Sequence, residues 1–272
     1  MTQQRLRLLV LPEDSGVDGF ATIKTVVRHL LEYIEPNGVL WKDEGRDHEW
    51  IDPRTREELT LVHAAAWKVE RPSDPALIEQ KRDLKRAVVT HLLLHETFDG
   101  QRKPIGFVFF HHDGDDAWSS HTNCTLCQQF RDFLLELEQT VRAVINRDER
   151  LQSDDPDTVV GRALSRLFPV EPHWSVEAWL LGKSERARTL CVEKHHGLHD
   201  GPNAWWQISR AELEERSQPK KSCLKDCNNL ALARVFDAKG AYGESPSFTA
   251  LADSVLGCQD LLDALHDVAT GV

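Results

Sequence analysis

One stretch of the sequence, residues 104–118, constrains the fold more than any other. Its first half, PIGFVFF, is apolar and rich in aromatic residues, whereas its second half, HHDGDDAW, turns abruptly to histidine, aspartate and glycine. A short apolar run with this ending predicts a buried strand of a parallel sheet. Ligands of open α/β sheets bind in the crevice beyond the strand ends, where Asp113 and Asp115 would hold a divalent cation through oxygen atoms. The structural alternative is a polar turn, since Asp and Gly are common in turns.

The first apolar run of the chain ends in the same way. Residues 5–11, RLRLLVL, are followed by Pro12, Glu13, Asp14, a serine and a glycine before a helical pattern begins. In a parallel sheet the Glu13 carboxylate would lie at the same edge as Asp113, because the strands end on the same side. Two acidic strand ends, each followed by glycine and then a helix, favour one shared metal site.

Strand and helix patterns alternate along the first two thirds of the chain. Strands are expected at 5–11, 59–66, 105–110 and 167–170, and amphipathic helices at 20–34, 73–98, 122–146 and from Trp174 onward. Residues 35–56 contain Pro, Gly and many charges, which predicts a surface loop. Three or four helices follow residue 208, including 224–236 and 248–266. This order predicts an α/β fold with a doubly wound, mainly parallel four-stranded sheet, flanked by helices and followed by a helical tail.

The composition excludes some classes of protein. A net charge of −11 argues against a general nucleic-acid coat protein, because phosphate binding needs clustered Lys and Arg. It is compatible with a nucleic-acid enzyme whose acidic metal pocket has a basic rim. No segment approaches the roughly 20 apolar residues of a membrane span, so we expect a cytoplasmic protein without membrane contact. The six Cys residues are then expected to be reduced thiols or metal ligands rather than disulfides.

A third acidic residue, Glu177, lies in the segment PHWSVEAWLLG, where a helix is expected to follow the fourth strand. The helix dipole alone would favour a carboxylate at this position. Together with LVLPEDSG around Glu13 and FVFFHHDGDD around Asp113, however, this segment resembles the Toprim fold. More narrowly, it resembles the RloB-like branch and its relatives of unassigned function. The later segments PKKSCLKD and ESPSFTALADSVLGC are similar to the helical tail of that branch.

The resemblance implies a Toprim-like α/β domain over residues 1–183 and a helical C-terminal extension over residues 184–272. It also implies a Mg²⁺- or Mn²⁺-dependent nuclease that hydrolyses phosphodiesters in bacterial anti-phage defence or DNA metabolism. Glu13 matches the first-strand glutamate of the family, a metal ligand or general acid/base, and Asp113 with Asp115 matches the metal-binding pair. Glu177 matches the helix glutamate. Asp116 is an alternative member of the pair, because HDGDD can be aligned in two registers.

Cysteine spacing suggests a second metal. C-x-x-C is a zinc half-site, and a structural zinc ion could join two predicted helix starts through a set drawn from His121, Cys124, Cys127, Cys223 and Cys227. Buried cysteines acting as small apolar side chains are the alternative, and this is what we expect of Cys191 and Cys258.

Other functions stay open at this point. The chain could be a non-catalytic Toprim-like partner subunit that relies on zinc for stability, or a metal-dependent phosphohydrolase acting on a small substrate. The motif G-x-x-x-x-G-K-[ST] is absent from the sequence, so any ATP-driven step would need a separate ATPase or defence-system partner. Four basic residues are expected to form a solvated helix face, with phosphate contacts as the alternative: Lys81, Arg82, Lys85 and Arg86.

Overall fold

The computed structural model describes residues 5–13, 17–37, 48–51, 67–68, 75–97, 104–114, 125–151, 155–172, 176–180 and 229–270. Its centre is one parallel sheet of four strands in the order β2-β1-β3-β4. The strands are β1 (Arg5–Leu11), β2 (His48–Ile51), β3 (Pro104–His111) and β4 (Leu167–Val170). The prediction of a four-stranded parallel sheet flanked by helices is therefore confirmed.

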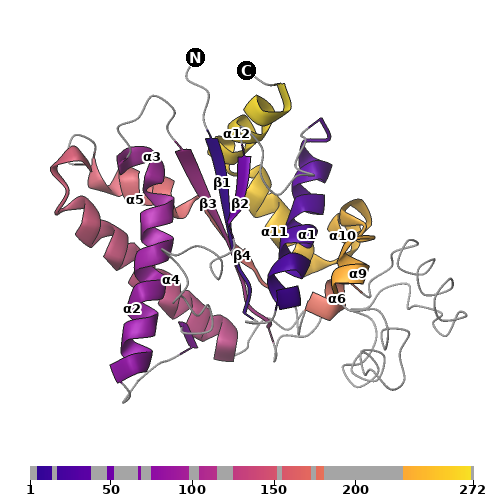
Figure 1. The fold of residues 1–272 in the computed structure, drawn as a ribbon, viewed down its shortest axis with the longest axis horizontal. Coiled ribbons are helices and arrows are strands. Elements are labelled where there is room, and N and C mark those ends of the chain that lie inside the picture. Colours follow the sequence, from indigo (N-terminus) through magenta and orange to yellow (C-terminus); the bar gives the residue numbers. More distant parts are fainter. Residues whose placement is uncertain are drawn as a thin grey trace, which may run out of the picture.

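Helices cover both faces of the sheet. The helices between strands are α1 (Val17–Ile34), α2 (Pro75–Leu92), α3 (Leu94–Thr97), α4 (Thr125–Ile145) and α5 (Pro156–Leu164), with the short 3-10 helix η2 (Glu149–Leu151) before α5. After β4 come α6 (Val176–Leu180), α9 (Asn229–Ala233), α10 (Ala238–Glu244), α11 (Pro246–Leu256) and α12 (Gln259–Thr270). In Figure 1, α2 and α4 lie on one side of the sheet and α1 and α11 on the other. None of the described helices combines the length and the apolar character that a membrane crossing requires.

Alternate side chains of the strands pack into two different hydrophobic cores. On β3, Phe107 and Phe109 belong to the core formed with α1 and the C-terminal helices, whereas Val108 and Phe110 belong to the core formed with α2, α4 and α5. This division follows from the two-residue period of a strand, which sends successive side chains to opposite faces. Both faces of β3 are buried, which explains why the sequence of this strand is continuously apolar rather than alternating.

The second strand differs from the prediction. It is His48–Ile51, within the segment that we expected to be a loop, and the predicted strand at 59–66 lies outside the described residues. The sequence HEWI looks too polar for a strand, yet every residue of β2 is buried. Glu49 is tolerated there because its carboxylate ion-pairs with Arg5 at 3.3 Å and Arg7 at 3.4 Å on the neighbouring β1. β2 therefore forms because it pairs with β1, and the local sequence pattern does not reveal this pairing.

The helices also differ in detail from the predicted ranges. The helix predicted at 73–98 ends at Leu92 and is followed by the separate short helix α3, and the one predicted at 248–266 is divided between α11 and α12. Helix α5 had no counterpart in the prediction, although Asp155 caps it by accepting a hydrogen bond from the Thr158 N–H. The C-terminal helices share one hydrophobic core with α1 and the sheet. Cys258, in the break after α11, is buried as expected.

Two buried features hold helices against the sheet. Gly106 on β3 lies so close to α2 that a Cβ atom there would be 2.2 Å from the His91 carbonyl oxygen, so this approach requires glycine.

Arg166 directly precedes β4, and its side chain is only 2% exposed. It forms ion pairs with Glu96 of α3 at 3.2 Å and with Asp260 of α12 at 2.6 Å. Arg166 therefore links helices from the two faces.

Candidate functional site

Two of the predicted metal ligands meet at the carboxyl edge of the sheet. β1 and β3 are neighbours, with Leu11 paired to Phe110, so Glu13 and Asp113 leave adjacent strands. The Asp113 N–H donates a hydrogen bond to Glu13 Oε2 at 2.5 Å, and the Glu13 N–H donates to His111 Nδ1 at 3.3 Å. The Glu13 side chain is 15% exposed and that of Asp113 25% exposed. Solvent therefore reaches both carboxylates.

Both carboxylates also have partners within the chain. Lys68 donates a hydrogen bond to Glu13 Oε1, which makes its ammonium group the cation nearest to that carboxylate among the described contacts. Asp113 Oδ1 accepts a hydrogen bond from the Val176 N–H at the start of α6 at 3.1 Å and lies 3.2 Å from His111 Nε2. Because His111 Nδ1 is an acceptor, a neutral ring carries its proton on Nε2, the nitrogen that faces Asp113. The cluster Glu13, Lys68, His111 and Asp113 is called the edge cluster below.

The other predicted members of this site are only partly placed. Glu177 follows Val176 in α6, so its backbone lies next to Asp113 at the same edge, and its side chain is outside the described part of the chain. Asp115 and Asp116 also lie outside the described residues. The structure thus brings Glu13 and Asp113 together and puts the backbone of Glu177 beside them.

One of the two described cysteines, Cys127, differs from the expectation. Cys127, in the first turn of α4, is buried and disulfide-bonded rather than a reduced thiol. The expectation rested on the predicted compartment, and spacing along the sequence does not report the oxidation state of a sulfur atom. His121, Cys124, Cys223 and Cys227, the other members of the predicted zinc set, lie outside the described residues, as does Cys191. Cys258 is a free thiol whose pKa is raised by burial.

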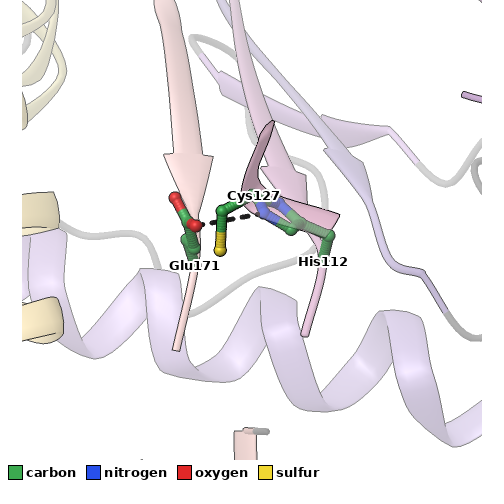
Figure 2. Close-up of side chains that lie close together, drawn as sticks. All are labelled: His112, Cys127 and Glu171. Carbon is green, nitrogen blue, oxygen red and sulfur yellow. Dashed lines mark ion pairs between the residues drawn. The ribbon is translucent and has the colours of Figure 1, made fainter. Parts of the chain in front are cut away.

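A second group of metal-ligating side chains lies directly beside the edge cluster. His112, Cys127 and Glu171 offer one ligand atom each, and these three atoms all lie within 4.8 Å of one another. Figure 2 shows the Cys127 sulfur beside the His112 ring and the Glu171 carboxylate, with the pair His112 Nε2 and Glu171 Oε1 3.4 Å apart. The three residues come from the loop after β3, from α4 and from the position after β4. We call this group the thiol cluster; it is a potential metal-binding site.

The basic residues of α2 have a structural role. Lys81 and Lys85 both donate hydrogen bonds to the Glu136 carboxylate of α4, at 2.8 and 3.1 Å. Burial raises the pKa of Glu136, but the hydrogen bonds and the positive charges of Lys81 and Lys85 together outweigh burial, so the pKa is lowered. A groove of about 410 Å³ lies between the two helices, and it is lined by Arg82, Lys85, Arg86, Val89, Thr90, Leu93, Thr140 and Val144. Thr140 is 13 residues beyond Cys127 on α4, about 20 Å along the helix axis, so this groove is remote from the edge cluster.

Several residues at this edge were not predicted as functional. The sequence gives a signal for His111 and His112, because both directly precede the predicted aspartate pair. It gives none for Lys68 or Glu171, whose positions depend on how distant segments pack.

Comparisons with family models, with characterised proteins and with solved structures produced no match for the chain. The resemblance to the Toprim fold therefore stays a prediction.

Proposed function

We propose that this protein is a Toprim-type, Mg²⁺- or Mn²⁺-dependent nuclease that hydrolyses phosphodiester bonds of nucleic acid at the edge cluster. One observation carries the proposal: Glu13 and Asp113, 100 positions apart in the sequence, come from adjacent strands and are joined by a hydrogen bond at the carboxyl edge of a parallel sheet. This edge is where open α/β sheets bind ligands. Carboxylate oxygens are the donors that Mg²⁺ prefers, so the residues present fit such an ion.

The chain's own residues have distinct tasks in this proposal. Glu13 and Asp113 would hold the ion, which stabilises negative charge on phosphate oxygens and lowers the pKa of a bound water when present. Lys68 now neutralises Glu13, as a cation at that carboxylate is expected to do. Once released from Glu13, its ammonium group would be available to contact a phosphate oxygen. The Val176 N–H donates to Asp113 Oδ1 and orients that carboxylate, while His111 Nε2 lies 3.2 Å from the same oxygen without a hydrogen bond to it.

The partners follow from this chemistry. A nucleic-acid substrate must approach a chain with a net charge of −11, so binding requires a local basic contact, to which Lys68 would contribute. A role in anti-phage defence or DNA metabolism, with a separate ATPase or defence-system partner, belongs to the same proposal and rests on the family resemblance alone.

The experiment measures cleavage of DNA and RNA, single- and double-stranded, by the purified protein with Mg²⁺, with Mn²⁺ and with a chelator. Glu13→Gln and Asp113→Asn keep side-chain size but remove the charge, and we expect each to abolish metal-dependent cleavage. Asp263→Asn is the matched control, because Asp263 lies on α12 and bonds only to Gln259 of the same helix among the described contacts. Isothermal titration with Mg²⁺ should show weaker binding to the first two variants only. Unchanged cleavage by Glu13→Gln would contradict the site assignment.

A second candidate is a non-catalytic Toprim-like subunit that uses a structural zinc ion. It is favoured by the internal partners of the edge carboxylates, since Lys68 bonds to Glu13 and the start of α6 bonds to Asp113. Metal analysis and titration separate the two candidates. Stoichiometric zinc without measurable Mg²⁺ affinity would select the non-catalytic subunit, whereas Mg²⁺ binding that depends on Glu13 would select the nuclease.

A further inference from the structure

The thiol cluster contains a buried histidine whose ring nitrogens have no hydrogen-bond partner. The His112 side chain is fully buried, and neither Nδ1 nor Nε2 forms a hydrogen bond within the described part of the chain. A buried polar group without a partner is costly, and such groups in folded proteins have a reason such as an ion or a catalytic role. The two ring nitrogens of His112 therefore indicate that this side chain binds a ligand from outside the protein.

Aromatic packing fixes the direction in which the His112 ring points. Phe130 of α4 stacks on the ring with 4.1 Å between ring centroids, and Trp67 meets it edge-on at 5.3 Å. The ring cannot turn without disturbing this buried packing, so Nε2 stays directed toward Glu171. This is the orientation that a ligand to a metal ion requires before the ion arrives.

The distance between His112 and Glu171 suits a shared metal ion better than a direct hydrogen bond. His112 Nε2 and Glu171 Oε1 are 3.4 Å apart, and no hydrogen bond joins them. Two donor atoms at about 2.1 Å from a tetrahedral ion lie about 3.4 Å from each other. Nitrogen, sulfur and carboxylate oxygen are the donors of zinc sites, whereas Mg²⁺ takes oxygen ligands. The geometry and the donor set both select Zn²⁺ rather than the ion proposed for the edge cluster.

We propose that His112, Cys127 and Glu171 bind Zn²⁺ when Cys127 is reduced, and that this ion ties α4 to the strand ends next to Asp113. In the structure Cys127 is disulfide-bonded, and a sulfur in a disulfide is not available as a thiolate ligand. A dithiol reductant supplies two electrons and two protons, which convert the disulfide into two thiols while the dithiol becomes a cyclic disulfide. The Cys127 thiol then loses its proton as it binds Zn²⁺. The reduced protein can therefore bind Zn²⁺ at this site, and the oxidised protein cannot.

The site would act on the loop that carries Asp113. His112 directly precedes Asp113, and its N–H donates to the Val170 carbonyl oxygen at the end of β4 at 3.2 Å. Glu171 follows Val170 directly. An ion on His112 and Glu171 therefore adds a side-chain link to the backbone hydrogen bonds that already join the ends of β3 and β4, and its bond to Cys127 adds a link to α4. This proposal rests on the thiol cluster alone and does not require that the edge cluster is catalytic.

The test is zinc binding by the 272-residue protein. Protein treated with a dithiol and protein kept oxidised are each titrated with Zn²⁺ in competition with a chromophoric chelator. We expect the reduced protein to bind one equivalent, and Cys127→Ser and His112→Gln to weaken binding by more than about 100-fold, since even loss of a second-shell partner weakens metal sites by about 10- to 100-fold. Cys258→Ser removes a buried thiol outside the cluster and should bind as wild type does. Co²⁺ in place of Zn²⁺ should give a sulfur-to-metal charge-transfer band that Cys127→Ser lacks.

Glu171→Gln tests the same site without a substitution in the buried core, because the Glu171 side chain is 35% exposed and glutamine has the same size. It therefore keeps the test decisive if the variants of buried residues misfold. Circular dichroism and thermal unfolding of each variant establish that it is folded. Equal zinc affinity in wild type, Cys127→Ser and Glu171→Gln would overturn the proposal, and so would equal binding by oxidised and reduced protein. Zinc binding by a wild-type protein that cleaves no nucleic acid would count against the edge cluster only, and cleavage without zinc binding would count against the thiol cluster only, so the two proposals fail separately.

Discussion

The burial of His91 on α2 predicts a specific acid sensitivity of the fold. The His91 side chain is buried, its Nε2 lies 3.2 Å from the Arg7 carbonyl oxygen, and its pKa is lowered to about 3. Burial is the main cause, the nearby Arg7 charge adds to it, and the carbonyl groups of Arg7 and Phe107 oppose it in part. The folded protein thus keeps this ring neutral through the pH range in which an exposed histidine becomes charged.

The size and sign of the effect follow from proton linkage. In the unfolded chain His91 should have the ordinary pKa of about 6.5, so below that pH the unfolded state binds a proton that the folded state rejects. His91 therefore contributes its full stability above about pH 6.5 and loses it as the pH falls toward 3. Between pH 7 and pH 5 the loss amounts to about 2 kcal/mol in the free energy of unfolding. The slope below pH 6 approaches about 1.4 kcal/mol per pH unit.

The measurement compares wild type with His91→Gln, whose amide is similar in size and does not titrate. Urea unfolding is followed by tryptophan fluorescence at pH values from 8 down to 5. The difference in unfolding free energy between the two proteins should be constant above pH 7, which is the internal control, and should shift by about 2 kcal/mol in favour of the glutamine variant by pH 5. A difference that stays constant over the whole range would show that His91 takes up a proton in the folded state, and the reasoning would be refuted.

Two further predictions concern the packing of helices on the sheet. Gly106→Ala should destabilise the protein by about 3 kcal/mol, because its Cβ would lie 2.2 Å from the His91 carbonyl oxygen. Gly161→Ala is the control, since no atom lies within 4 Å of its Cβ in α5, and it should stabilise by up to about 1 kcal/mol. Arg166→Met should cost about 1 to 3 kcal/mol, because it removes one of two arginine partners of the Glu96 carboxylate, which is 7% exposed and keeps Arg162 at 3.4 Å. Urea unfolding measures all three, and a Gly106→Ala variant as stable as wild type, or an Arg166→Met variant within 1 kcal/mol of it, would contradict these accounts.

The sequence pattern predicted strands and helices that depend on local interactions or are completely buried. β3 and β4 are continuous apolar runs, and β4 was predicted with the bounds Leu167–Val170 that the structure has. β2 was missed because its burial depends on the pairing of Glu49 with arginines of β1. The division between α11 and α12 at Gly257 was missed because the apolar pattern continues across it. A contact between distant segments decided the first case, whereas the second break is local, with the Gly257 N–H donating to the Asp253 carbonyl oxygen at the end of α11.

The same limit applies to the candidate site. Glu13 and Asp113 could be predicted because each follows a recognisable strand, and parallel strands end at one edge. Lys68 and Glu171 carry no local signal, since one is an ordinary lysine and the other an ordinary acidic residue after a strand. Only the packing of residues 67–68 and of β4 against β3 brings them to the site.

The alternation of a strand explains how one short sequence, HHD, can serve two clusters of different chemistry. His111 and Asp113 lie together, 3.2 Å apart, in the edge cluster, whereas His112 lies against Phe130 in the core formed with α4. The segment 67–68 repeats this division, since Trp67 contacts the His112 ring and Lys68 bonds to Glu13. Because one peptide bond joins His112 to Asp113, a metal ion that restrains the histidine also restrains the backbone of the carboxylate. The two clusters are therefore expected to be coupled mechanically even though we propose different ions for them.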